Sequence, residues 1–211
     1  MENYIFIHGL GQTGASWDKV IQELALPLSD GNAISCPQIS ELLENQEYTY
    51  GNLYRAFSEY CERSEGTLHL CGLSAGAILA LHYAIDHPEK MGSVVLIAAQ
   101  YEMPKMLLKF QSVLFHLMPE KNFKSMGFQK KDFIRLSDSM AELNFKKELS
   151  KMECPALILC GEHDRANQKA AKGLAERMKN AEYRIIPNAG HEANTDNPQE
   201  LAALIGRFFS G

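Results

Sequence analysis

Ser74 is the residue of this sequence best placed for covalent chemistry. It lies in Gly72-Leu73-Ser74-Ala75-Gly76, between an apolar run (residues 68–71) and a run of good helix formers (residues 77–81). A strand that turns directly into a helix holds a serine at the apex of a tight turn, so that its hydroxyl projects from the edge of a sheet. The pattern predicts a nucleophile, and the alternative at this point is an ordinary glycine-rich turn without chemistry.

A serine hydroxyl needs a base to take its proton and a third group to orient that base. His191 follows the predicted strand 183–186, and Asp164 follows the predicted strand 155–160. The carboxyl ends of parallel strands meet at one edge of a sheet, so we expect Ser74, Asp164 and His191 to converge there. The backbone N–H of Ala75, at the start of the predicted helix, would face negative charge developing near the serine.

Several neighbouring residues offer alternatives to these assignments. Glu102 follows the predicted strand 93–98 and is the alternative acid. We expect His8 to be structural, with its ring bonded to nearby backbone, because a base is already supplied. Trp17 is expected to pack the first helix, and Glu162 and His163 are expected at free, exposed loop positions.

Strands and helices alternate along the chain, and this order predicts a doubly wound, mostly parallel α/β sheet. The first of its strands, residues 4–7, is an all-apolar run, as expected for a strand in the middle of a parallel sheet that is covered on both faces. The predicted strands are residues 4–7, 33–37, 68–71, 93–98, 155–160 and 183–186. The predicted helices are residues 16–26, 49–63, the segment from 77 to the His87-Pro88 stop, 166–180 and 198–209.

Residues 101–151 break the alternation, since they contain no predicted strand and carry apolar residues at helical spacing. We expect at least two helices that form a lid over the carboxyl edge of the sheet, where ligands bind in such folds. Met103, Leu107 and Phe110 are candidates for lining a substrate pocket. The predicted organisation is a single domain, with its core in residues 1–100 and 152–211 and the lid and its connection in residues 101–151.

Composition limits the possible partners. A net charge of −5 argues against nucleic acid, and no apolar run approaches the about 18 residues of a membrane helix. The N-terminus has no basic segment followed by a long apolar run, so no signal peptide is expected. Five cysteines without paired spacing indicate a reduced, cytoplasmic protein. The remaining histidines have neither cysteine partners nor helical pairing with one another, so no metal is expected.

Residues 9–14 spell Gly-Leu-Gly-Gln-Thr-Gly, the pattern of a dinucleotide-binding turn. An acidic residue is expected at the end of the second strand of such a site, but Cys36-Pro37 stands there. We therefore expect no cofactor.

These motifs together resemble the α/β-hydrolase fold family over nearly the whole chain. His8-Gly9-Leu10-Gly11 resembles its oxyanion loop and Gly72–Gly76 its nucleophile elbow, while Gly161-Glu162-His163-Asp164 and Gly190-His191 resemble its acid and histidine loops. The family commonly carries two antiparallel strands before the one leading to His-Gly. That strand starts at residue 4 here, so a sheet of about six strands is expected.

The resemblance implies that Ser74 is the nucleophile, His191 the base and Asp164 the orienting acid. It also implies an oxyanion hole made by the backbone N–H groups of Leu10 and Ala75. The first functional hypothesis is a carboxylesterase-like serine hydrolase that cleaves a small-molecule ester or thioester. A lyase on the same residues, similar to the menaquinone-pathway members of the fold, and a non-catalytic receptor are the alternatives. The sequence does not decide between a monomer and a homodimer.

Overall fold

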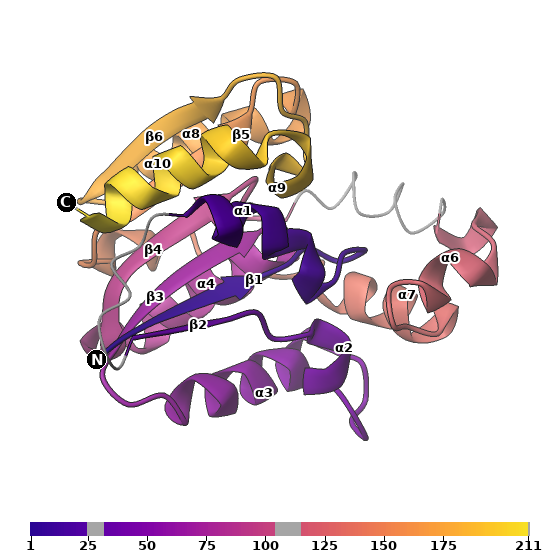
Figure 1. The fold of residues 1–211 in the computed structure, drawn as a ribbon. Coiled ribbons are helices and arrows are strands. Elements are labelled where there is room, and N and C mark those ends of the chain that lie inside the picture. Colours follow the sequence, from indigo (N-terminus) through magenta and orange to yellow (C-terminus); the bar gives the residue numbers. More distant parts are fainter. Residues whose placement is uncertain (25–31, 104–114, 211) are drawn as a thin grey trace.

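The computed structural model describes residues 1–24, 32–103 and 115–210 of the chain. Its centre is a six-stranded sheet in the order β2-β1-β3-β4-β5-β6, and every neighbouring pair of strands is parallel (Figure 1). The predicted doubly wound sheet of about six strands is confirmed, and it is entirely rather than mostly parallel. The strands are β1 (Glu2–Ile7), β2 (Ala33–Ser35), β3 (Thr67–Leu73), β4 (Met91–Ile97), β5 (Ala156–Gly161) and β6 (Ala181–Ile186).

Helices cover both faces of the sheet. One face packs on α3 (Tyr50–Glu62), α4 (Ala75–Asp86) and α8 (Arg165–Ala175). The other packs on α1 (Asp18–Glu23), α9 (Ala193–Asp196) and α10 (Pro198–Ser210), and α1 lies against α10 (Figure 1). The remaining short helices of the core are η1 (Gly14–Trp17), α2 (Ile39–Leu42) and η2 (Pro88–Lys90).

The four central strands, β1, β3, β4 and β5, are recognisable in the sequence because both of their faces are buried, whereas the edge strands β2 and β6 are partly exposed. In β1, Ile5 and Ile7 join the core on the α4 side, while Tyr4 and Phe6 join the core on the α10 side. Successive side chains of a strand point to opposite faces, so a strand buried on both faces is apolar at most of its positions.

Two predicted helices end earlier in the structure. The first is a 3-10 turn followed by α1, and it stops at Glu23 because Leu24 is already extended, with ψ 107°. The helix predicted for residues 166–180 ends at Ala175. Asn180 is needed at the amino end of the sheet, where its carbonyl accepts the Ala156 N–H and its side chain donates to the Glu153 carbonyl.

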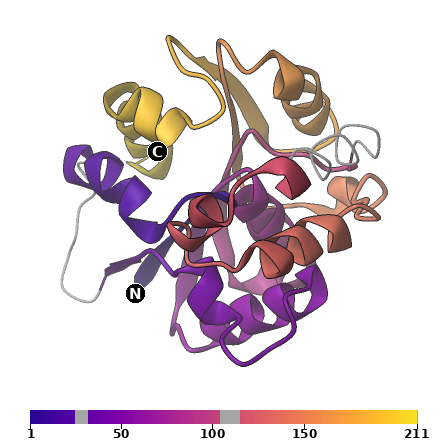
Figure 2. The same ribbon diagram turned by 90° about the vertical axis from the view of Figure 1, so that its right-hand side faces the viewer.

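The inserted segment contributes α6 (Glu120–Lys124), α7 (Lys130–Ser139) and η3 (Leu149–Lys151). Figure 2 shows α6 and α7 in front of the end of the sheet. Phe123 and Phe133 are buried in their shared core, with ring centroids 5.2 Å apart. One isolated bridge pairs Glu102 with Asn144. Within the described ranges, no helix is both long and apolar enough to span a bilayer.

Candidate active site

Ser74 lies between the end of β3 and the first residue of α4. Its backbone has φ 55° and ψ −114°, a conformation that costs free energy in any residue with a side chain. Its N–H donates to the carbonyl of Ile97 at the end of β4, at 2.9 Å. The strain is thus held by the neighbouring strand, as expected of a nucleophile elbow.

The glycines on either side of Ser74 let the helix cross the sheet closely. A Cβ on Gly72 would collide with the backbone of Gly76, and one on Gly76 would collide with the carbonyl oxygens of Ile7 and His8. Backbone rather than flexible side chain lies at each contact, so neither neighbour can move aside easily.

The structure brings the three predicted reactive residues together as a chain, here called the triad (Ser74, His191 and Asp164). His191 Nε2 lies 3.1 Å from Ser74 Oγ, and His191 Nδ1 lies 2.9 Å from Asp164 Oδ2. A carboxylate can only accept hydrogen bonds, so Nδ1 carries the proton and Nε2 is left to accept the serine proton. This is the tautomer that a general base requires.

Burial differs sharply along the triad. The Asp164 side chain is 5% exposed, whereas that of His191 is 46% exposed at the mouth of the site. Burial alone would raise the pKa of Asp164, but hydrogen bonds from His191 and Asn167 outweigh it and the pKa falls below its ordinary value. The hydrogen bond to Asp164 raises the pKa of His191, against the opposing effect of burial. Asp164 therefore stays ionised beside an imidazole that it can stabilise when charged.

Two residues of the site were missed by the sequence analysis. Asn167 Nδ2 lies 2.8 and 2.9 Å from the two oxygens of Asp164, and Asn167 Oδ1 accepts from Gln100 Nε2 at 2.6 Å. An asparagine three residues beyond an acid, and a glutamine after another strand, carry no distinctive signal in the sequence. Only the fold reveals that they meet.

The loops that carry Asp164 and His191 are joined along their backbones. The N–H of His163 donates to the Ala189 carbonyl at 2.9 Å, and a Cβ on Gly161 would collide with the carbonyls of Ala189 and Gly190. The prediction that Glu162 is free is wrong, because its carboxylate accepts the N–H of Asn188 at 2.9 Å. Asn188 has φ 55°, so this bond supports the turn that leads to the histidine.

The predicted oxyanion loop lies against Ser74. The N–H of Gln12 donates to the Gly9 carbonyl at 3.1 Å, and the turn places Gly11 at φ 98°, where glycine is favoured. A Cβ on Gly9 would lie 3.4 Å from the Cβ of Ser74. Leu10 is therefore in the turn beside Ser74, and Ala75 is the first residue of α4. Their role as oxyanion donors stays a prediction.

The side chain of Gln12 ties this loop to the segment after the histidine. Gln12 and Asn194 are both buried, and their amides exchange hydrogen bonds of 2.9 and 3.1 Å. Asn194 also donates to the carbonyl of Ser16 at 3.2 Å. The loop at residues 9–12 and the segment after His191 are thus fixed relative to each other by amides that carry no charge.

The other candidates have ordinary surroundings. His8 is fully buried, with Nε2 accepting from the N–H of Ile39 and Nδ1 2.9 Å from the carbonyl of Gly9. Burial lowers the pKa of His8 and so favours the neutral ring. Trp17 packs on Phe6 with centroids 5.3 Å apart, as predicted. Glu102 contacts Asn144 and Lys146 instead of His191.

The glycines of the possible dinucleotide motif have roles in packing and turning. A Cβ on Gly14 would lie 2.8 Å from the carbonyl of Cys36, which explains the glycine without a phosphate. Among the described residues, no group of three or more histidine, cysteine, aspartate or glutamate side chains is arranged to hold a metal ion.

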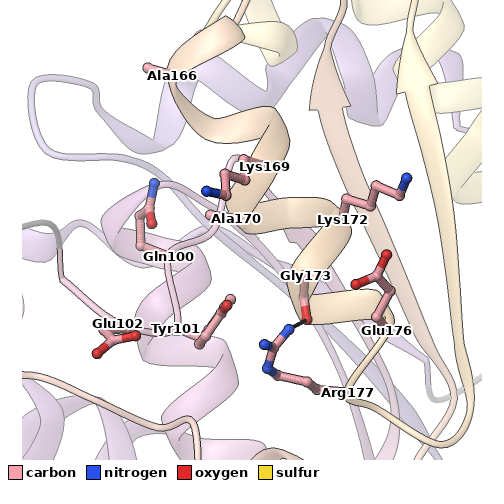
Figure 3. Close-up of a pocket in the computed structure, with 10 residues that line it drawn as sticks. All are labelled: Gln100, Tyr101, Glu102, Ala166, Lys169, Ala170, Lys172, Gly173, Glu176 and Arg177. Atoms are coloured by element: carbon pink, nitrogen blue, oxygen red, sulfur yellow. Dashed lines mark hydrogen bonds between the residues drawn. The ribbon is translucent and has the colours of Figure 1, made fainter.

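A hollow of about 490 Å³ lies beside the acid loop, between α8 and the segment after β4 (Figure 3). Gln100, Tyr101 and the small residues Ala166, Ala170 and Gly173 line it, and Arg177 lies over the Tyr101 ring. The triad residues are not among the described residues that form its walls, so it adjoins the acid side of the site rather than the serine.

Of the three residues predicted to line a substrate pocket, the structure describes Met103. Met103 is buried in the core on the α4 side and donates its N–H to the carbonyl of Leu143. Leu107 and Phe110 lie outside the described residues. The proposed acyl pocket is therefore still a prediction.

Comparison with known proteins agrees with this geometry. A model of the alpha/beta hydrolase family matches residues 4–204. The chain belongs to the alpha/beta hydrolase family. It is thus a hydrolase of the alpha/beta hydrolase kind, as the sequence analysis expected.

Individual relatives of this alpha/beta hydrolase are distant. Pimeloyl-[acyl-carrier protein] methyl ester esterase of Aeromonas hydrophila is 25% identical over 97% of this chain and 94% of its own length. Alpha/beta hydrolase domain-containing protein VTE7 of Arabidopsis thaliana is 24% identical over 76% of this chain, and the match spans only 58% of that relative. The crystal structure of MGS-M2, an alpha/beta hydrolase enzyme from a deep-sea metagenome library of the Medee basin, has a TM-score of 0.80 at 19% identity. The structural alignment covers 100% of this chain and 90% of the MGS-M2 chain.

Proposed function

We propose that this alpha/beta hydrolase cleaves the carboxylic ester or thioester of a small molecule through an acyl-enzyme on Ser74. The observation that carries the proposal is the unbroken chain from Ser74 Oγ to His191 and on to Asp164, with contacts of 3.1 and 2.9 Å. Serine, imidazole and carboxylate in this order supply a nucleophile, a base and a group that orients the base.

In the acylation step, Ser74 Oγ bonds to the carbonyl carbon of the substrate while its proton passes to His191 Nε2. The carbonyl oxygen becomes an oxyanion, and the backbone N–H groups of Leu10 and Ala75 are the proposed donors to it. Asp164 stabilises the imidazolium that forms. His191 then gives the proton to the leaving alcohol or thiol as the bond from carbon to the leaving group breaks, and the acyl group stays on Ser74.

In the deacylation step, water takes the place of the serine hydroxyl. His191 removes a proton from the water as its oxygen bonds to the acyl carbon, and the proton returns to Ser74 Oγ when the ester bond breaks. The products are a carboxylic acid and the free enzyme. The half-exposed ring of His191 leaves room for this water at the mouth of the site.

The similarity to a methyl ester esterase over almost the full length of both chains supports an ester as the substrate. The two alternatives make different demands on the site. A lyase would use Ser74 only to remove a proton, and no acyl-enzyme would form. A receptor would need no base held 3.1 Å from a serine by a buried carboxylate.

Rapid-mixing kinetics with 4-nitrophenyl esters of short and medium acyl chains test the proposal. We expect a burst of 4-nitrophenol of about one equivalent per enzyme, or steady turnover with an acyl-enzyme that intact mass spectrometry detects after acid quenching. Ser74→Ala should abolish both signals. Turnover of the natural substrate without an acylated intermediate would favour the lyase, and failure to react with any ester or thioester would contradict the proposal.

A further inference from the structure

The carboxylate of Asp164 is held from the side opposite His191 by a neutral amide. Asn167 Nδ2 lies 2.8 Å from Oδ1 and 2.9 Å from Oδ2, so one nitrogen faces both oxygens. Asp164 precedes α8 at its N-cap position, and no capping hydrogen bond of ordinary geometry joins its carboxylate to the helix backbone, although the nearby N–H of Asn167 also helps to lower its pKa. An N-cap aspartate ordinarily turns its oxygens toward the first backbone N–H groups of its helix. Here the carboxylate faces Asn167 and His191 instead.

A second amide fixes the orientation of the first. Gln100 Nε2 donates to Asn167 Oδ1 at 2.6 Å, which leaves the Asn167 nitrogen facing Asp164. The flipped Asn167 amide would place its oxygen against the carboxylate, and with Gln100 unchanged its nitrogen would face the Gln100 donor, so the contacts with both partners would become repulsive. Asn167 is buried, and Gln100 is half-buried on the wall of the hollow beside α8 (Figure 3).

We propose that Asn167, held by Gln100, is a positioning residue that aims Oδ2 of Asp164 at His191 Nδ1. The inference rests on the proposed function for its catalytic consequence, but the arrangement itself can be tested without a substrate. Neither residue reaches the reacting atoms, since both act through Asp164. Gln100 orients Asn167, and Asn167 orients Asp164. Asp164 in turn orients His191 toward Ser74.

The electrostatics support this role. The bond from Asn167 is one of the contacts that hold the pKa of Asp164 below its ordinary value against the effect of burial. Asn167 Nδ2 is also 3.2 Å from His191 Nδ1. Both nitrogens are donors when Nδ1 is protonated, so they converge on the carboxylate and do not bond to each other. Without the Asn167 side chain the carboxylate would lose the hydrogen bonds to both of its oxygens, and we expect it to shift toward the N–H groups of α8 and away from the imidazole.

The test is an NMR titration of the His191 imidazole, assigned by comparison with His191→Gln. Asn167→Leu removes the amide at similar volume and should lower the measured pKa of His191 toward its ordinary value, because the contact with Asp164 that raises it is weakened. The acidic groups of its own segment, Glu192 and Asp196, also face His191 and stay unchanged. Gln100→Met, at a less buried position, should act in the same direction with a smaller shift.

Kinetics of ester hydrolysis supply a second measurement. We expect Asn167→Leu to lower kcat about tenfold with little change in KM, a factor close to the lower end of what one hydrogen bond to a charged group contributes. The double variant Gln100→Met/Asn167→Leu should be no slower than Asn167→Leu alone, because Gln100 acts through Asn167. Asn180→Leu is the control for the same substitution at an exposed position, since Asn180 donates to a backbone carbonyl at the other end of the sheet, and it should change neither quantity.

The outcomes separate this inference from the proposed function. An unchanged pKa of His191 in folded Asn167→Leu and Gln100→Met overturns the inference, even if either variant is less stable. Additive losses of kcat in the double variant also overturn it. A wild-type protein that hydrolyses no ester contradicts the proposed function, while the titration still decides how Asp164 is positioned.

Discussion

Two serine–histidine–carboxylate arrangements lie at opposite ends of the same sheet. The triad is at the carboxyl edge. The second arrangement, here called the strand cluster, consists of Glu2, His69 and Ser93 near the starts of β1, β3 and β4. Ser93 Oγ lies 2.7 Å from His69 Nδ1, and His69 Nε2 lies 2.7 Å from Glu2 Oε2. By residue type and distance alone, the strand cluster would pass for a catalytic triad.

The two serines differ in their backbone and surroundings. Ser74 is at a strained turn with the start of a helix behind it, whereas Ser93 is the third residue of β4, which continues to Ile97. Ser93 is 6% exposed. Tyr4 stacks on the His69 ring with centroids 4.8 Å apart, and Phe209 meets its edge. An attacking serine needs room for a carbonyl and donors for its oxyanion, and the strand cluster has neither a turn nor a helix start to supply them.

Position in the fold, and not residue type, distinguishes the triad from the strand cluster. The strand cluster arises from register, because His69 and Ser93 are direct partners across β3 and β4. Its hydrogen bonds join three strands, which is a structural role. The triad is built from three loops at the edge where ligands bind in open parallel sheets.

Replacing Ser74 and replacing Ser93 should give the largest difference in kcat. Ser74→Ala should lower kcat for ester hydrolysis by about 10⁶-fold, as expected when the nucleophile of a triad is lost. Ser93→Ala should leave kcat within about twofold, since the mutation removes only a hydrogen bond between strands. Steady-state kinetics on both purified variants measure the difference, and a comparable loss in the two would mean that position does not separate them.

Removing the charge of Asp164 or of Glu2 should give the second-largest difference in kcat. Asp164→Asn should lower kcat by about 10⁴-fold in a folded protein, because an amide can hold the imidazole in the wrong tautomer. Glu2→Gln should have little effect on kcat. Circular dichroism controls for folding. If Glu102→Gln were the damaging change and Asp164→Asn were mild, the alternative acid would be the correct one despite its contacts with Asn144 and Lys146.

The tight turn at residues 72–76, which has no counterpart in the strand cluster, can be disrupted by a mutation that leaves the three triad side chains unchanged. Gly76→Ala should lower the free energy of unfolding by about 3 kcal/mol, because its Cβ would meet the backbone of Ile7. The matched control is Gly51→Ala in the first turn of α3, where a Cβ meets nothing within 4 Å. That change should stabilise the protein by up to about 1 kcal/mol. Urea denaturation compares the two, and equal effects would show that the helix crossing at the elbow is not close.

The pH dependence of kcat/KM should report the triad histidine alone. His191 acts as a base only when neutral, so activity should fall about tenfold per pH unit below its pKa. The bond to Asp164 raises that pKa, which places the acid limb above the ordinary value of 6.5. His69→Gln should leave the limb where it is. A limb well below 6.5 would indicate that Asp164 does not stabilise the imidazolium.

The sequence reveals the triad but not the strand cluster, and the reason is physical. Ser74, Asp164 and His191 each follow an apolar strand, and the fold class alone carries the ends of parallel strands to one edge. The meeting of His69 with Ser93 depends on strand register, and that of Asn167 with Gln100 on the rotation of α8 relative to β4. Neither the strand register nor the rotation of the helix can be inferred from the spacing of residues along the sequence. Glu162 was misjudged for the same reason, since its partner is the N–H of Asn188 in a different loop.

Reaction with a fluorophosphonate probe, followed by digestion and tandem mass spectrometry, decides whether Ser74 is the activated serine of this protein. The probe forms a covalent adduct only with a serine that a base activates and that an attacking electrophile can reach. We predict a single adduct on the peptide containing Ser74, none on the peptide containing Ser93, and no adduct in Ser74→Ala. An adduct on Ser93, an adduct that persists in Ser74→Ala, or an unreactive wild-type protein would contradict the account.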